Sequence, residues 1–163
     1  MGVYTHSPVG ETVFVAESGL GLGNTDPRFG ETREIAQARA QVIGAVGIES
    51  EGTYVIVPKA RDDFVDVDEP SEKISRNMDL HEIEVDADAL ITRRTNVGLM
   101  LNPADCIPLV LHDAKTRVLS LVHLGWSGAS LRLHGQVIDY AQQQYGVEPS
   151  RLKAYMGPSI AAE

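Results

Sequence analysis

The sequence predicts an α/β (α+β layered) fold, in which helices flank mixed β-sheets. Two observations carry this prediction. Short apolar and β-branched segments, which are typical of strands, recur along the chain, and one amphipathic helical segment interrupts them in each half. The resulting order of strands, helix, strands, helix and strand indicates layers of sheet and helix.

The N-terminal half is predicted to hold three strands and one helix. Residues 12–16 form a short β-branched segment, and the Gly-, Asn-, Asp- and Pro-rich connection "ESGLGLGNTDPRFGE" that follows has the length of a functional loop. Residues 31–46 place apolar side chains on one helical face, with Arg39 at its border. "TYVIVP" and "FVDVD" follow as strands, and we expect the polar stretch of residues 69–84 to be a surface loop.

The C-terminal half has a more regular pattern. "DALIT", "VGLML", "IPLVLHD" and "VLSLVHL" are four strand-like segments, and "DAKT" has the composition of a hairpin turn. Because these segments are strongly apolar, they predict a largely buried sheet. A helix is expected over residues 129–145, with Leu131 among its inward residues, and the strand "LKAYMG" follows it.

Length and composition fit one domain that spans residues 1–163. A chain of this size buries enough surface to fold without disulfides, and its single cysteine has no partner for an internal bridge. The N-terminus lacks the pattern of a secretory signal, and the chain holds no run of eighteen apolar residues. We therefore expect a cytoplasmic protein that does not bind to a membrane and that has a free, catalytic or metal-bound thiol.

The charge of the chain argues against nucleic acid as a partner. The formal net charge is −9, whereas binding to a phosphate backbone depends on clustered Lys and Arg. The basic run "TRR" at residues 92–94 is short and fits a solvated loop. These observations favour a small molecule as the ligand.

Cys106 and His123 are the residues whose positions suggest chemistry. Cys106 lies in a Pro-Ala-Asp-Cys turn before a buried strand, and His123 lies near the end of the next strand, where an apolar residue would pack at lower cost. A lone cysteine also packs well as a small hydrophobe. If the pair is functional, it can act as a nucleophile and a base, or as two ligands of zinc or copper.

Two further positions near this pair are candidates. Asp105 can accept a hydrogen bond from an imidazole and fix its tautomer, or it can cap its own turn. Gly125 precedes Trp126 and the second predicted helix, and backbone N–H groups at such a start can bind an anion.

Several motifs resemble those of one family. "ADALIT", "PADCIPLVLHD", "VHLGWSG" and "GPSI", in this order and at these intervals, resemble the YfiH-type laccase-domain proteins, also called the multicopper polyphenol oxidoreductase family. The segment "LGLGNTDPRFGETREIAQARAQVIGAVGI" is similar to the N-terminal part of the same family. The family domain continues beyond "GPSI", so we expect its C-terminal part to be absent from this chain.

The resemblance implies a fold, an activity and a site. The fold is that of layered mixed sheets shared with cysteine hydrolases of the necrotizing-factor toxin type. The activity is that of a purine nucleoside phosphorylase with adenosine deaminase side activity, formerly named polyphenol oxidase, so the implied substrates are purine nucleosides and phosphate. The family site is a His, Cys, His set that binds zinc or copper, and its last two members fall on Cys106 and His123.

The chain departs from the family pattern at the remaining ligand. The first family histidine falls on "KARD", which places Arg61 there, and a guanidinium offers no lone pair to a metal. The family Gly-Trp-Arg-Gly is "GWSG", with Ser127 in the Arg position. We therefore expect weak or absent metal binding, and an Arg61 that reaches the same pocket to pair with Asp105 or an anion.

Three functions remain open from the sequence. The first is an enzyme acting on purine nucleosides, in which Cys106 and His123 hold a metal or act directly while Arg61, Gly125, Trp126 and Ser127 contact the substrate. The second is a metal-free hydrolase with Cys106 as nucleophile and His123 as base. The third is a catalytically degenerate module that binds a ligand or a partner. A true multicopper oxidase is disfavoured because five scattered histidines cannot supply its ligands.

Overall fold

The structure is a computed structural model that describes residues 3–18, 22, 25–26, 30–58 and 63–160. Its strands are β1 (Val3–His6), β2 (Val15–Ser18), β3 (Thr53–Ile56), β4 (Phe64–Asp66), β5 (Ile74–Asn77), β6 (Glu82–Val85), β7 (Ala89–Thr92), β8 (Gly98–Met100), β9 (Ile107–Asp113), β10 (Val118–Leu124) and β11 (Lys153–Met156). Its helices are α1 (Thr32–Gly44), α2 (Trp126–Ser130) and α3 (Leu133–Tyr145), with short 3-10 turns at Ser50–Gly52 and Pro149–Arg151. Within these ranges no helix is long and apolar enough to cross a membrane.

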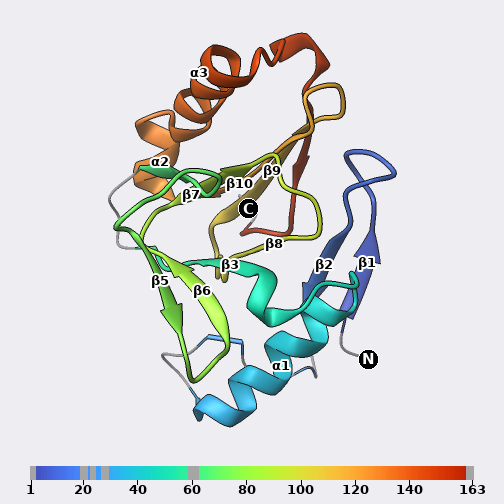
Figure 1. The fold of residues 1–163 in the computed structure, drawn as a ribbon, viewed down its shortest axis with the longest axis vertical. Helices are drawn as coiled ribbons and strands as arrows, with labels where there is room; N and C mark the ends of the chain where they lie inside the picture. The colour runs from blue at the N-terminus through green and yellow to red at the C-terminus, as the bar shows by residue number, and fades with distance from the viewer. Residues whose placement is uncertain (1–2, 19–21, 23–24, 27–29, 59–62, 161–163) are drawn as a thin grey trace.

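The strands form two larger sheets and one hairpin (Figure 1). The order is β11-β9-β10-β7-β4 in the five-stranded sheet and β5-β6-β3-β8 in the four-stranded sheet, while β1 pairs with β2. Both larger sheets are mixed, because β4 runs parallel to β7 and β3 runs parallel to both β6 and β8. The prediction of mixed sheets flanked by helices is therefore confirmed.

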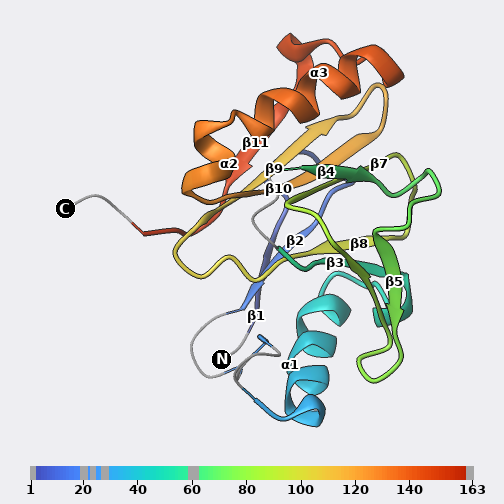
Figure 2. The ribbon, with the colours of Figure 1, turned by 90° about the vertical axis from the view of Figure 1, so that its left-hand side faces the viewer.

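The elements stack in layers (Figure 2). Helix α3 lies over one face of the five-stranded sheet, and α1 lies at the opposite end of the molecule, beyond the four-stranded sheet. One apolar core fills the space between the two sheets and includes Tyr54, Val85, Leu90, Val110 and Leu121. A second core lies between the five-stranded sheet and α3 and includes Ala89, Ile91, Leu109, Val122 and Val137.

The alternation of side chains along β10 decides which residues face which core. Leu121 belongs to the core between the sheets, and Val122 belongs to the core under α3. Because successive side chains of a strand point to opposite faces, His123 lies on the same face as Leu121. The face between the sheets therefore ends in a histidine.

The polar stretch of residues 69–84, predicted to be a surface loop, contains the antiparallel pair β5 and β6 instead. The loop prediction is wrong because the polar side chains are satisfied within the structure. Asn77 donates a hydrogen bond to Glu84 across the pair at 2.7 Å, and Glu82 is buried. A strand whose charged residue is paired in the interior does not show an alternating apolar pattern.

Two other predicted boundaries differ from the structure. The first predicted strand, residues 12–16, is shifted to β2, and its partner β1 was not predicted. The second predicted helix is two helices, because Arg132 adopts a left-handed conformation with φ 55° between α2 and α3. This break turns Leu131 outward, where it is 58% exposed, so its predicted inward position is wrong.

Arg39 is buried, and its predicted place at the border of the apolar face of its helix is wrong. It forms an ion pair with Glu82 of β6, and both side chains are almost fully enclosed. Burial raises the pKa of Glu82, and the neighbouring Arg39 guanidinium lowers it without cancelling the effect of burial. The pair joins α1 to the four-stranded sheet.

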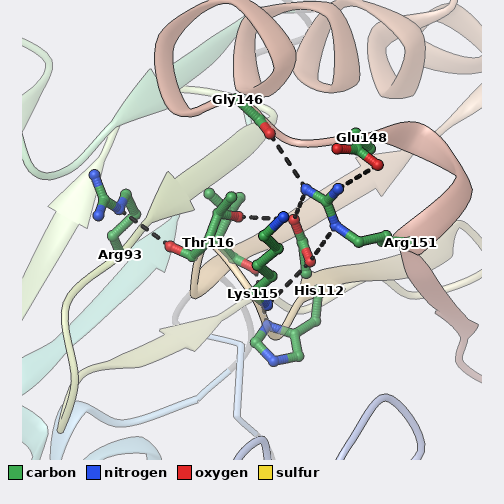
Figure 3. A network of polar contacts seen from close by, with 9 residues as sticks. Arg93, His112, Lys115, Thr116, Gly146, Glu148 and Arg151 are labelled. Carbon is green, nitrogen blue, oxygen red and sulfur yellow. Dashed lines mark hydrogen bonds and ion pairs between the residues drawn. The ribbon is translucent and has the colours of Figure 1, made fainter.

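A second buried carboxylate, Asp113, is the last residue of β9, and Figure 3 shows the residues around it. Asp113 accepts hydrogen bonds from the backbone N–H of Lys115 at 3.1 Å, the Thr116 hydroxyl at 3.0 Å and the Arg151 guanidinium at 3.1 Å. Arg151 also pairs with Glu148. Burial by itself raises the pKa of Asp113, but the hydrogen bonds from Arg151, Lys115 and Thr116 outweigh it and lower the pKa below 3.8.

We predict that Asp113→Asn lowers the free energy of unfolding at pH 7 by about 1–3 kcal/mol, because it removes charge-assisted hydrogen bonds inside the protein. A carboxylate whose pKa is lower in the folded state stabilises the fold above its unfolded pKa of 3.8, and this contribution is lost as the pH falls through the folded value. Urea unfolding of wild type and Asp113→Asn at several pH values from about 7 down to about 2 measures the free energy of unfolding of each protein.

The control is Glu148→Gln, which changes the exposed partner of the same arginine and should affect stability much less. A difference between wild type and Asp113→Asn that stays constant down to the acid limit would contradict the role given to the ionised carboxylate.

Candidate active site

Cys106, His123 and Asp88 lie side by side at one end of three neighbouring strands. Cys106 immediately precedes β9, His123 is the second-last residue of β10, and Asp88 immediately precedes β7. β10 pairs with both of the other strands in antiparallel register, with His123 opposite Pro108 on β9. Continuing both registers by one residue places Cys106 opposite Gly125 and Asp88 opposite His123.

The thiol and the imidazole converge on the space beside Gly125. A Cβ atom at this glycine would lie 3.4 Å from Cys106 Sγ and 3.8 Å from His123 Cε1. Both side chains therefore border the same point, on the same face of the sheet. Both are only partly exposed, with 16% of the His123 side chain accessible.

Asp88 holds the imidazole from the other side. Its Oδ1 lies 3.1 Å from His123 Nδ1, and its backbone carbonyl accepts the His123 N–H at 2.8 Å. The Asp88 side chain is only 5% exposed. A carboxylate at Nδ1 favours the tautomer that carries its proton there, which leaves Nε2 with a lone pair for a proton, a metal or a substrate.

The sequence prediction gave this orienting role to Asp105. In the structure the imidazole nitrogen bonds to Asp88, whereas Asp105 is exposed and its backbone carbonyl accepts the N–H of Ile160 at 3.1 Å. Asp88 is missing from the predicted site, although it lies in "DALIT", which was predicted to be a strand and is part of the family motif "ADALIT". The available signal was an acidic residue at the start of a strand otherwise free of charge.

The turn that carries Cys106 is strained. The backbone N–H of Cys106 donates to the carbonyl of Pro103 at 3.0 Å. Between these residues, Ala104 has a φ of 50°, a left-handed value that is uncommon outside glycine. The turn brings the chain from β8 into β9 with the thiol at the strand end.

The predicted substrate-contact residues lie in and before α2. Gly125 is its N-cap in an extended conformation, Trp126 is 89% exposed at its first position, and Ser127 is half-buried at its second. Trp126 therefore offers an exposed aromatic face three residues after His123, next to Gly125, where the thiol and the imidazole converge.

Arg61 lies outside the described residues, so the prediction that it enters this site stays a prediction. Two other histidines, His81 and His6, were candidates for the missing metal ligand. His81 is exposed in the turn between β5 and β6. His6 lies on β1, where its ring packs edge-on against Tyr155 with centroids 4.9 Å apart.

The described residues do not fit a metal centre. In the part of the chain that the structure describes, no group of three or more His, Cys, Asp or Glu side chains is arranged to hold an ion. Cys106 and His123 supply two ligand types, and Asp88 is engaged with His123 Nδ1. A catalytic zinc needs three protein ligands and an open position, and copper sites also need more than this pair.

A separate hollow lies at the opposite end of the same strands. Its volume is about 370 Å³, and it is lined by Asp68, Glu69, Arg93, Arg94, Arg117 and Tyr145. Arg93 follows the end of β7, and Arg117 precedes β10, whereas Asp88 and His123 lie at the other ends of these strands. The hollow is therefore not part of the Cys106 and His123 site.

The sequence matches the family model described as multi-copper polyphenol oxidoreductase laccase over residues 15–163. A purine nucleoside phosphorylase of Deinococcus radiodurans is 29% identical over 149 residues, which cover 86% of this chain and 50% of that protein. An adenosine deaminase named RL5, from an unknown prokaryotic organism, is 35% identical over 91 residues, 54% of this chain and 34% of that protein. The chain thus spans half the length of the first of these relatives and matches a third of the second.

Solved structures share the fold. The hypothetical protein YfiH of Bacillus licheniformis superposes with a TM-score of 0.71 at 20% identity, over 98% of this chain and 55% of that one. Protein NMB0706 of Neisseria meningitidis superposes with a TM-score of 0.70 at 19% identity, over 99% of this chain and 64% of that one. These superpositions agree with the layered architecture expected from the sequence.

We predict that the purified protein carries less than one zinc per chain and that Cys106 reacts with a thiol reagent without prior chelation, because two ligands bind a divalent ion poorly. Elemental analysis and thiol titration of the same sample measure both quantities. One tightly held zinc per chain, with a thiol that reacts only after a chelator is added, would contradict the prediction and indicate a third ligand.

Proposed function

Because the chain belongs to the multi-copper polyphenol oxidoreductase laccase family, we propose that it acts on purine nucleosides, with phosphorolysis as its main reaction and adenosine deamination as a side activity. The observation that supports this most directly is the Asp88–His123 pair beside the Cys106 thiol. The names of the two relatives supply the substrate class. We propose residues 1–163 as a single domain of this kind, in a chain that spans half of its phosphorylase relative.

In phosphorolysis a phosphate oxygen bonds to C1′ of the ribose while the glycosidic C–N bond breaks and its electron pair passes to the purine. The leaving purine then needs a proton or a hydrogen-bond donor. In this proposal His123 first takes up a proton at Nε2 from water or from dihydrogen phosphate, the Asp88 carboxylate at Nδ1 stabilises the resulting imidazolium, and Nε2 then donates that proton to the leaving purine.

The remaining predicted residues contact the substrate in this proposal. Trp126 offers its exposed ring to stack on the purine, and Ser127 with the backbone after Gly125 offers hydrogen bonds to phosphate or ribose. Arg61 contributes a guanidinium to the phosphate. Cys106 borders the same point as His123, and in this proposal its thiol acts beside the imidazole at the reacting atoms.

The runner-up function is a metal-free hydrolase. One observation favours it: the order thiol, imidazole, carboxylate across β9, β10 and β7 is that of a nucleophile, a base and an orienting group. In this reaction the Cys106 thiolate attacks the carbonyl carbon of an amide or ester, His123 takes the thiol proton and passes it to the leaving group, and water releases the acyl group. A degenerate binding module is the third candidate, and the Arg61 substitution favours it.

We predict that the protein releases free base from inosine or adenosine only when phosphate is present, with ribose 1-phosphate formed in equal amount. Asp88→Asn should lower kcat about a hundredfold or more, because the imidazole loses the carboxylate that fixes its tautomer and charge. Chromatography of base and sugar phosphate measures the reaction.

Two controls make the assay decisive. Asp139→Asn changes an exposed acid on α3 and should retain wild-type activity, while Cys106→Ala tests the thiol and exposes any contaminating phosphorylase. Equal release of base by wild type, Cys106→Ala and Asp88→Asn would overturn the proposal. Hydrolysis of a p-nitrophenyl ester that is lost in Cys106→Ala, without any phosphorolysis, would favour the hydrolase.

A further inference from the structure

A chain of hydrogen bonds connects the buried Arg39 on α1 to the turn that carries Cys106. Arg39 Nε donates to the backbone carbonyl of Thr25 at 2.7 Å, and the Thr25 hydroxyl donates to Asn102 Oδ1 at 2.9 Å. Asn102 opens the turn of residues 102–106. The contacts thus link three segments that are far apart in the sequence.

The starting point of this chain is fixed. Arg39 is 2% exposed, and its Nη1 atom pairs with the equally buried Glu82. A guanidinium presents several N–H groups in one rigid plane, so holding Nη1 at Glu82 also sets the direction of Nε toward Thr25. A buried charge with two such partners has little freedom to rearrange.

The end point needs support. The left-handed conformation of Ala104 costs free energy, and such a conformation persists only where neighbouring contacts hold it. The turn is held internally by the Cys106 N–H and on one side by the Ile160 N–H, which bonds to the Asp105 carbonyl. The Thr25 hydroxyl at Asn102 holds it at its start.

We propose that Arg39 and Thr25 are positioning residues that hold the turn of residues 102–106 so that the Cys106 thiol faces His123. The inference rests on the proposed function in treating the Cys106 and His123 pair as the working site. Neither Arg39 nor Thr25 touches the thiol or the imidazole in the described contacts. They act through Asn102: Thr25 lies in the segment before α1 and bonds to Asn102 directly, and Arg39 on α1 bonds to Thr25.

The hydrogen bonds from Arg39 through Thr25 to Asn102 form a relay, and the test removes its bonds one at a time. Thr25→Val removes the hydroxyl donor with little change of shape, and Thr25→Ser restores it. Arg39→Lys keeps the charge beside Glu82 but loses the fixed second donor to Thr25. Thr95→Val, at an exposed threonine with no described side-chain hydrogen bond, is the matched control.

We expect amide hydrogen exchange at Cys106 to accelerate about tenfold in Thr25→Val and Arg39→Lys, the change that corresponds to losing one hydrogen bond. The kcat for base release should fall about tenfold with KM within about twofold, because the thiol is misplaced while substrate binding is retained. Thr25→Ser and Thr95→Val should match wild type in both measurements, and the urea midpoint of Thr25→Val should stay close to that of wild type.

Unchanged exchange at Cys106 in both Thr25→Val and Arg39→Lys would overturn the proposal, whatever the activity. Faster exchange with unchanged kcat would also overturn it, because the relay would then hold the turn without positioning the thiol for chemistry. If wild type releases no base, the proposed function fails, and the exchange measurement alone decides whether the relay holds the turn.

Discussion

The pairing of β10 with both β9 and β7 is the constraint on which the rest of the structure depends. Seven residues of β10 pair with β9, and four pair with β7, so the register is fixed on both sides. A slip of one residue would move Leu121 and His123 to the face under α3 and bring Val122 into the core between the sheets. The apolar cores on the two faces therefore determine where the thiol, the imidazole and the carboxylate meet.

The strands of the central sheet could be predicted from the sequence because they are buried on both faces. "IPLVLHD" and "VLSLVHL" are rich in apolar residues, and their predicted bounds agree with β9 and β10. β5 and β6 were missed because Glu82 breaks the apolar pattern, and only its contact with Arg39 makes its burial possible. Local patterns do not contain such pairing between distant segments.

The site shows the same division. Cys106 and His123 stood out because each is an unusual residue at the end of an apolar strand. Asp88 did not stand out in the sequence, since its contact with His123 depends on the antiparallel register of β7 and β10. That register places it opposite His123, 35 residues away. Arg39 was predicted at the border of the apolar face of its helix because a charged side chain is normally exposed. In each case the missing information was the identity of a partner from another segment.

Gly125 lies beside both the thiol and the imidazole, yet its backbone conformation does not require glycine. Its φ of −77° is open to any residue, and a methyl group would meet Cys106 Sγ at an ordinary contact distance. What glycine provides is an open space where both reactive groups can meet a third molecule. An alanine at this position would keep the backbone conformation and place its methyl group in that space. The size of this one side chain therefore sets how closely a third molecule can approach the thiol and the imidazole together.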